Sequence, residues 1–228
     1  PYRHRRIDAS ALNARRAIRG STRLGVPDER RADPRLAGRP ARARIRAARD
    51  ASGKKTLIEG GVGTAFGCTL QGEVKVEEVL RLMQALLDAG ADRVSLADTV
   101  GYADPHSVSV LVEKALRIAG NKLCCGHFHD TRGLALANAY ATLSLGIQRF
   151  DASLAGIGGC PHAPGASGNA ATEDLVFMLA ASGVKTGIDI PKLLALRQQV
   201  AGWLKGEQTH GTLWRAGLPK NFKGAMNG

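Results

Sequence analysis

The chain has 228 residues and a formal net charge of +12, with 44% hydrophobic but only 4% aromatic residues. This length is enough for one sizeable domain with a buried core. No apolar run approaches the roughly 18 residues needed to cross a bilayer, and the first residues show no secretory pattern, which argues against membrane and secreted proteins. The four cysteines form no CxxC motif, so reduced thiols and a cytoplasmic location are expected.

The positive charge is concentrated at the start of the chain. Residues 1–50 contain 15 Arg, no Lys and 5 acidic residues, a net of +10, whereas the remaining 178 residues hold 17 basic and 15 acidic residues, a net of +2. Three interpretations of this segment remain open: a basic arm that binds nucleic acid or acidic partners, a transit peptide, and sequence read from a wrong frame. We favour the third for residues 1–53, because an Arg bias that stops near Lys54 has no obvious physical purpose.

From Lys54 onward, short apolar strands are expected to alternate with amphipathic helices. Apolar residues follow helical spacing, Pro105 suits the first turn of a helix, and glycines such as Gly120 and Gly146 follow helix ends. In chain order, the sequence predicts strand 55–62, helix 73–88, strand 93–98, helix 105–119, strand 122–130, helix 134–145, strand 147–155, helices near 170–181 and 190–204, and a tail over 205–228.

This alternation predicts an α/β fold with parallel strands and right-handed crossovers. Both an open doubly wound sheet and a (β/α)8 barrel fit, and both gather their chemistry at the carboxyl ends of the strands. Polar residues follow three successive predicted strands, and their side chains are therefore expected to share one site. These residues are Asp98 and Thr99, then His127, His129 and Asp130, and then Asp151 and Ser153.

The stretch "GHFHDTRG" places two of the six histidines one residue apart. Alternate residues of a strand point to the same face, so His127 and His129 are expected to project together while Phe128 packs against the helices. Two imidazoles on one face can bind a single metal ion. The alternative is a pair of hydrogen-bonded core histidines, and the neighbouring acidic residues favour the metal site over it.

A glycine-rich loop follows the last predicted strand in "GIGGCPHAPGASGNAATED". Its composition is typical of a shaped active-site loop, in which the Cys160 thiol can give or take a proton. Asn169 suits either the N-cap of the next helix or a ligand of a hard cation, and the residues alone leave this open. Glu173 and Asp174 fall in the first helical turn, where the helix dipole favours acids.

Four segments together resemble the hydroxymethylglutaryl-CoA lyase family over roughly residues 54–200. They are "GTAFGCTLQGEV", "SLADTVGYADP", "GHFHDTRGLALANA" and "FDASLAGIGGCPHAPGASGNAATEDLVFML". The resemblance implies a TIM (β/α)8-type barrel, of which this chain would hold about strands four to eight.

The resemblance also implies a divalent cation, magnesium or manganese, and a set of site residues. The implied metal ligands are His127, His129 and Asn169. The implied catalytic residues are Cys160 as the thiol and Asp98 as an acid that handles protons, with Glu173, Gly158 and Gly159 in support. The implied reaction cleaves 3-hydroxy-3-methylglutaryl-CoA to acetyl-CoA and acetoacetate, in leucine degradation and ketone-body formation. The implied partners are an acyl-CoA thioester and a second copy of the chain, with no membrane and no nucleic acid.

One part of the family pattern has no clear counterpart here. The family's first strand ends in an Arg-Asp pair that supplies the only carboxylate ligand of the metal. The dipeptide Arg49-Asp50 lies directly before the strand that resembles the fourth one, which is the wrong place. A chain without the first three strands leaves sheet edges unpaired and weakens the metal site, so negligible lyase activity is expected of it.

Two other kinds of function remain as alternatives. A related acyl-CoA lyase, such as one acting on citramalyl-CoA, or a condensing enzyme of the same superfamily would share these motifs. A nucleic-acid-binding protein acting through residues 1–50 is the non-enzymatic alternative, although Tyr2 is the only aromatic residue there to stack on bases.

Overall fold

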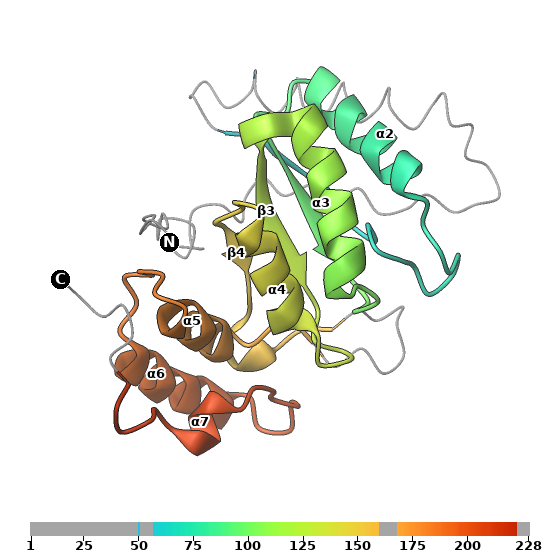
Figure 1. Ribbon diagram of the computed structural model, residues 1–228. Helices are drawn as coiled ribbons and strands as arrows, with labels where there is room; N and C mark the ends of the chain where they lie inside the picture. Colours follow the sequence, from blue (N-terminus) through green and yellow to red (C-terminus); the bar gives the residue numbers. More distant parts are fainter. Residues whose placement is uncertain (1–49, 51–56, 160–167, 223–228) are drawn as a thin grey trace.

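The computed structural model describes Asp50 and residues 57–159 and 168–222. A parallel four-stranded sheet lies at its centre, with the strands side by side in chain order (Figure 1). The strands are β1 (Glu59–Val62), β2 (Arg93–Asp98), β3 (Leu123–Phe128) and β4 (Phe150–Asp151).

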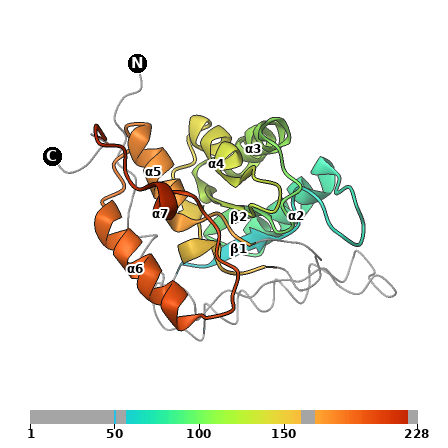
Figure 2. The same cartoon turned by 90° about the horizontal axis from the view of Figure 1, so that it is seen from below.

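Helices connect the strands and continue beyond the last one. They are α2 (Val76–Asp88), α3 (Pro105–Ala119), α4 (Ala135–Ser144), α5 (Thr172–Ala181), α6 (Ile190–Trp203) and α7 (Leu213–Ala216), with 3-10 turns η2 (Gly120–Lys122) and η3 (Leu154–Gly156). In Figure 2, α2 to α6 follow one another in an arc around the strands. This is the arrangement of the outer helices of a (β/α)8 barrel.

The start of α3 shows how the local sequence sets an element boundary. The Asp104 carboxylate accepts hydrogen bonds from the backbone N–H groups of His106 and Ser107, at 2.9 and 3.1 Å. The Ser107 hydroxyl oxygen accepts from the Asp104 N–H, which completes a capping box, and Pro105 occupies the first turn. These residues fix the point at which the chain leaves the loop after β2.

The hydrophobic core lies between the sheet and helices α2, α3 and α4. Val94 and Leu96 of β2 and Phe128 of β3 are almost fully buried there, together with Val79 and Leu111 from the helices. The residues between them on each strand face the other side of the sheet. Strand alternation therefore divides the sheet into an apolar face under the helices and a more polar face.

The predicted elements agree best with the structure from β2 to α4. Strand 55–62 was predicted too long, because residues 57 and 58 are outside β1, and helix 73–88 begins three residues later than predicted, at Val76. Strand 93–98 and helix 105–119 have the predicted bounds, and strand 122–130 is shorter by a few residues. Strand 147–155 was predicted too long, because only Phe150 and Asp151 are in the strand and Leu154–Gly156 forms a 3-10 turn. Helix α7 lies in the predicted tail, where four residues give no periodic pattern to detect.

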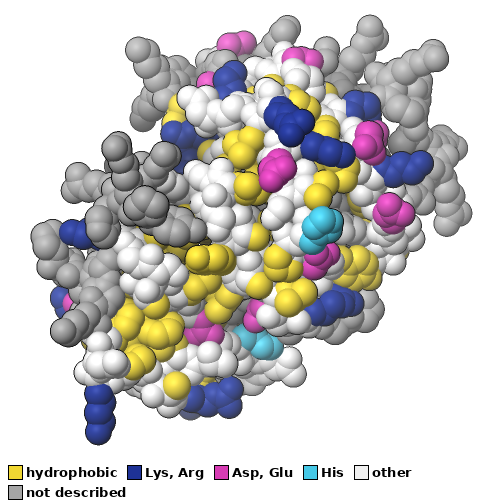
Figure 3. All heavy atoms as spheres, in the orientation of Figure 1, with side chains coloured by type: hydrophobic (Ala, Val, Ile, Leu, Met, Phe, Trp, Pro, Cys, Tyr) yellow, Lys and Arg dark blue, Asp and Glu magenta, His cyan; other side chains and the backbone are white. Residues whose placement is uncertain are grey.

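The sequence-based interpretation of residues 1–49 and 51–53, like the placement of Cys160, falls outside the described residues. No helix of the described part is both long and apolar enough to cross a membrane. Figure 3 shows basic and acidic side chains interspersed on the face of the described residues that it presents.

Candidate metal centre

The two histidines of the HxH motif lie together at the carboxyl end of β3. The ring centroids of His127 and His129 are 5.2 Å apart with an angle of 59° between the planes. Phe128 is 3% exposed, and its ring lies 6.1 Å from that of Phe66 within the apolar core. The predicted arrangement, with the histidines on one face and the phenylalanine on the other, is confirmed.

Asn169 lies beside this pair. Its backbone forms an isolated antiparallel bridge with His129, and the N–H of Ala170 donates to the carbonyl of Phe128 at 3.1 Å. Helix α5 begins only at Thr172, with Ala171 at the N-cap and no side-chain cap, so Asn169 is not the N-cap. The segment after the glycine-rich loop thus pairs with the chain just after β3 and places Asn169 opposite His129.

The side chain of Asn169 is oriented by the backbone of the loop. Its Nδ2 donates to the carbonyl of Ile157 at 2.9 Å and lies 3.5 Å from that of Gly158. Its Oδ1 is buried and makes no hydrogen bond within the described residues. A buried amide oxygen is costly to leave without a partner, and a cation would satisfy it.

Glycines make this orientation possible. Gly158 has φ +106°, and a Cβ there would lie 2.8 Å from Asn169 Nδ2. Gly168 has φ +119°, and a Cβ there would lie 2.2 Å from the carbonyl oxygen of Gly156. A side chain at either glycine would collide with these atoms and force the backbone of the turn to shift. Gly158 therefore lies next to Asn169, one of the predicted metal ligands. Gly159 is exposed, and no contact among the described residues supports the predicted supporting role for it.

A carboxylate also faces the pair. Asp151 Oδ2 lies 4.0 Å from His127 Nδ1, and the two residues are register partners on neighbouring strands. A carboxylate that accepts a hydrogen bond from the free ring nitrogen of a metal-binding histidine fixes its tautomer, and at 4.0 Å Asp151 is close to that nitrogen but outside hydrogen-bond distance. The polar strand ends indicated Asp151 from the sequence, but no role was predicted for it.

Asp98 is not brought to the histidine face. It is fully buried and pairs in register with Phe128, while its neighbour Ala97 pairs with His127. Its carboxylate accepts from the N–H groups of Tyr102 and Ala103, at 2.8 and 3.1 Å. Burial raises the pKa of Asp98 against the opposing effect of these donors. In the structure, Asp98 therefore stabilises the turn that follows β2. A catalytic role for Asp98 stays a prediction.

The acids at the start of α5 bind backbone groups rather than the histidines. Glu173 is 1% exposed and accepts from the N–H of Ala155, and Asp174 accepts from the N–H groups of Thr212 and Leu213. Burial raises the pKa of Glu173. Through these hydrogen bonds, the two acids connect the start of α5 to the turn at Ala155 and to the segment before α7. Their position in the first helical turn did not predict these long-range contacts.

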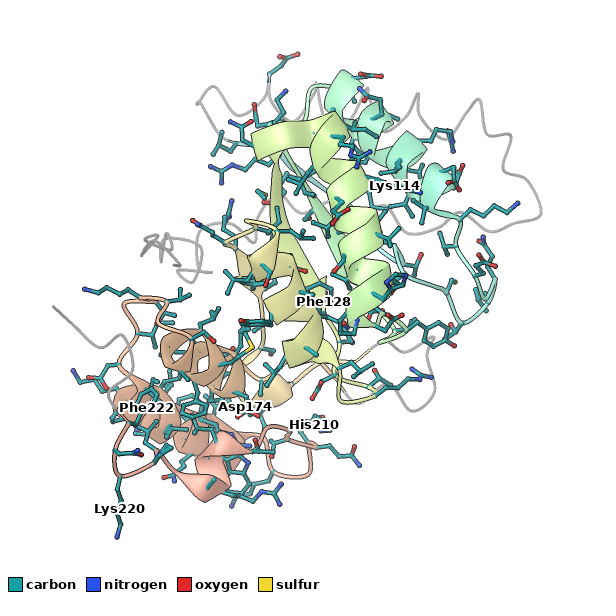
Figure 4. The ribbon with its side chains drawn as sticks, viewed as in Figure 1. Lys114, Phe128, Asp174, His210, Lys220 and Phe222 are labelled. Carbon is teal, nitrogen blue, oxygen red and sulfur yellow. The ribbon has the colours of Figure 1, made fainter. Side chains whose placement is uncertain are left out.

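Two further residues, Arg197 and His210, were not identified as candidate site residues from the sequence. Arg197 of α6 is 2% exposed and pairs with Glu173, with Nε 3.1 Å from Oε1. His210 lies in the loop before α7, next to Asp174 in Figure 4, where the carboxyl ends of the strands also lie. Neither belongs to a motif, because Arg197 stands within an ordinary helical pattern and His210 within the predicted tail.

A shallow cavity of about 450 Å³ opens at the same end of the sheet. Its lining comes from the loops after the first three strands and consists of one acidic and one basic side chain, two aromatic rings and a glycine: Glu73, Arg132, Phe66, Tyr102 and Gly72. The guanidinium carbon of Arg132 lies 4.6 Å from the centroid of the Tyr102 ring. Its Nη1 donates a hydrogen bond to the carbonyl of Gly101 at 3.0 Å. A fixed cation beside aromatic rings suits a ligand with phosphate groups and an aromatic base.

The described residues hold no group of three or more His, Cys, Asp or Glu side chains that could bind a metal. A cation at this place therefore depends on the Asn169 amide in addition to the two imidazoles. Amide oxygens and imidazoles are both ligands of divalent cations such as manganese. The buried, unsatisfied Oδ1 of Asn169 shows that the residues present fit such an ion.

This parallel sheet with helices on one face, and histidines and an amide at the strand ends, defines an α/β protein of the TIM-barrel type with a candidate cation site. The HMGL-like family model matches residues 18–200. The chain belongs to the HMGL-like family. The match begins within the Arg-rich segment, and the predicted boundary at residue 53 stays a prediction.

Relatives of known function are similar over part of their length. A hydroxymethylglutaryl-CoA lyase of Bacillus subtilis is 46% identical over 145 residues, which is 63% of this chain and 47% of that protein. An (R)-citramalyl-CoA lyase of Chloroflexus aurantiacus is 45% identical over 134 residues, which is 59% of this chain and 42% of that protein. The chain thus spans about half the length of the curated relatives it matches.

A solved structure supports the fold. The HMG-CoA lyase of Acinetobacter baumannii in complex with coenzyme A and 3-methylmalate has a TM-score of 0.75 and 38% sequence identity, covering 84% of this chain and 61% of that one. The TIM-barrel class predicted from the resemblance is confirmed. The four described strands form an open part of such a barrel.

Proposed function

We propose that this chain carries the metal-binding part of a divalent-metal-dependent carbon–carbon lyase that cleaves 3-hydroxy-3-methylglutaryl-CoA to acetyl-CoA and acetoacetate. The observation that carries the proposal is the backbone bridge between His129 and Asn169, which places a residue with a buried, unsatisfied amide oxygen opposite one of two neighbouring histidines. Relatives whose names state this activity support it.

His127, His129 and Asn169 would hold the cation, which we infer to be magnesium or manganese. When bound, such an ion lowers the free-energy cost of removing a hydroxyl proton and stabilises negative charge on carboxyl and carbonyl oxygens. Asp151 would orient the His127 ring, and the carbonyl of Ile157 fixes the Asn169 amide. These residues prepare the site before substrate arrives.

The substrate loses the proton of its 3-hydroxyl group, and the bond between its second and third carbons breaks. The electron pair of that bond passes to the second carbon and its thioester carbonyl, and the third carbon becomes the ketone of acetoacetate. We assign the return of a proton to the second carbon to the Cys160 thiol, on the resemblance alone. The product is then acetyl-CoA. The hydroxyl proton passes to solvent water and the Cys160 thiolate takes up a proton from solvent, so the reaction has no net gain or loss of protons.

The acyl-CoA thioester is proposed to lie across the carboxyl ends of the strands. The cavity lined by Tyr102 and Arg132 opens at that end and suits the phosphate and adenine groups of coenzyme A. A complex with coenzyme A in the A. baumannii structure supports a ligand of this class. A homodimer is proposed on the resemblance alone, and a cytoplasmic location on the absence of a CxxC motif among the four cysteines.

The test is an assay of this 228-residue chain with 3-hydroxy-3-methylglutaryl-CoA and manganese, measuring acetyl-CoA release. Turnover is expected to be negligible beside that of a complete lyase and measurable only with long incubation, because the family's first-strand Arg and Asp are not assigned to any described residue. The comparison is therefore with the His129→Ala variant and with a metal-free sample. Manganese-dependent release that this variant abolishes would support the proposal, and equal release in both proteins would refute it.

Citramalyl-CoA is a second candidate substrate. A citramalyl-CoA lyase is nearly as similar to this chain as the hydroxymethylglutaryl-CoA lyase is, at 45% against 46% identity. Both substrates release acetyl-CoA, so the assay must identify the keto acid that accompanies it. Release of acetoacetate from 3-hydroxy-3-methylglutaryl-CoA, with no keto acid released from citramalyl-CoA, would favour the first substrate. The opposite result would favour citramalyl-CoA.

A further inference from the structure

Four contacts form a closed ring around the start of segment 210–213. The N–H of Ala155 donates to both carboxylate oxygens of Glu173, at 3.0 and 3.1 Å, and the N–H of His210 donates to the carbonyl of Ala155 at 2.7 Å. Arg197 Nη2 donates to the carbonyl of His210 at 3.1 Å, and Arg197 Nε lies 3.1 Å from Glu173 Oε1. The backbone of His210 is thus held on both sides.

The ring is supported by its neighbours. The guanidinium carbon of Arg197 lies 4.2 Å above the ring of Trp214. Asp174 accepts from the N–H of Thr212 at 2.7 Å and from that of Leu213 at 2.9 Å. Removing one partner of a buried ion pair is strongly destabilising, so the ring of contacts holds segment 210–213 in one position.

That position sets the His210 side chain against the glycine turns beside Asn169. A Cβ on Gly156 would lie 2.9 Å from the Cβ of His210 and 3.0 Å from the carbonyl oxygen of Asn169. A Cβ on Gly168 would lie 3.4 Å from Cδ2 of His210. The imidazole therefore lies close to both Gly156 and Gly168, which neighbour each other in the turn that carries the amide.

We propose that His210 is a positioning residue of the cation site. It packs on Gly156 and Gly168 and thereby fixes the turn whose Ile157 carbonyl accepts from Asn169 Nδ2. With the amide nitrogen held in this way, the amide oxygen is directed away from the turn. What the site binds rests on the proposed function, whereas the link from His210 to the amide is a property of the fold.

The test uses the full chain without added metal. The rate at which the Asn169 side-chain NH₂ group exchanges with water is measured by nuclear magnetic resonance in the wild type, His210→Ala and His210→Gln. The expected result is exchange at least about tenfold faster in His210→Ala, a smaller change in His210→Gln, and little change in the denaturation midpoint. His106→Ala, which removes an exposed histidine from α3, is the matched control and should leave the rate unchanged.

A second measurement separates this inference from the proposed function. Manganese affinity, measured by calorimetry, should fall in His210→Ala by at least about tenfold, as expected for loss of a group that orients a ligand. If the wild type binds no manganese but His210→Ala still speeds exchange, the proposed function fails and the positioning role stands. Unchanged exchange in His210→Ala would overturn the positioning role whatever the metal binding, and if that variant does not fold, unchanged exchange in His210→Gln would do so.

Discussion

The backbone of Asn169 pairs with that of His129, although the two residues lie far apart in the sequence. The N–H of Asp130 donates to the carbonyl of Gly168 at 2.9 Å, so the same segment is bonded on both sides of the bridge. The segment that follows the glycine-rich loop thus acts as a short extension of the sheet. Its consequence is that the candidate ligands are placed by backbone hydrogen bonds rather than by side-chain contacts alone.

Replacing the amide tests this placement. Asn169→Ala should lower manganese affinity by at least about tenfold, because the only oxygen ligand of the proposed set is lost. Asn169→Asp restores an oxygen ligand and should bind manganese more tightly than Asn169→Ala. Calorimetric titration measures both. Equal affinities in the wild type and Asn169→Ala would remove the amide from the site.

The glycine turn can be tested with a matched pair of substitutions. Gly168 and Gly146 both have positive φ, at +119° and +96°, but a Cβ on Gly168 would meet backbone oxygen at 2.2 Å, whereas a Cβ on Gly146 would meet nothing within 4 Å. Gly146→Ala should lower the free energy of unfolding by about 1–2 kcal/mol through backbone strain. Gly168→Ala should cost more and should also weaken manganese binding.

Urea unfolding and calorimetry give the two readouts for this pair. The comparison separates the strain of an unusual backbone from the collision of a side chain with the turn. Loss of manganese binding in Gly146→Ala as well would show that the effect is general destabilisation and not a change at the site.

Much of the fold was predictable from local pattern. Helix 105–119 was predicted with its bounds because Pro105 and the apolar spacing mark it, and the facing of His127 and His129 follows from strand alternation. The position of Asn169 relative to His129 depends on a long-range bridge, which no local pattern reports. The same holds for His210, whose place is set by contacts with three other segments.

Asp98 offers a test between an anchoring and a catalytic role. Asp98→Ala leaves the N–H groups of Tyr102 and Ala103 buried without their acceptor, so the free energy of unfolding should fall by about 1–3 kcal/mol. Manganese affinity should be unchanged. Urea unfolding and calorimetry check both. A variant of normal stability with impaired acetyl-CoA release would instead favour proton handling by Asp98.

The cap of α3 predicts a pH dependence of stability. The backbone N–H of Ser107, followed by smaller contributions, lowers the pKa of Asp104 below its usual range. A carboxyl whose pKa is lower in the folded state stabilises the protein above its unfolded pKa of about 3.9 and loses that contribution as the pH falls through the folded pKa. Asp104→Ala should lower the free energy of unfolding by about 1 kcal/mol at pH 7, and the difference should shrink in acid.

Asp104→Asn is the control for the cap, because asparagine caps a helix without titrating. It should keep most of the stability at pH 7 and should lack the pH-dependent part of the effect. Thermal unfolding followed by circular dichroism between pH 2 and 7 measures all three proteins. The same pH dependence in Asp104→Asn as in the wild type would assign the titration to another group.

The most direct test of the cation site is a calorimetric titration of the full chain with manganese, run beside the double variant His127→Ala/His129→Ala. The proposed site predicts one ion bound per wild-type chain and an affinity lower by at least about tenfold in the double variant, with the fold retained by circular dichroism. Indistinguishable binding curves for the two proteins, or no binding to the wild type, would contradict it.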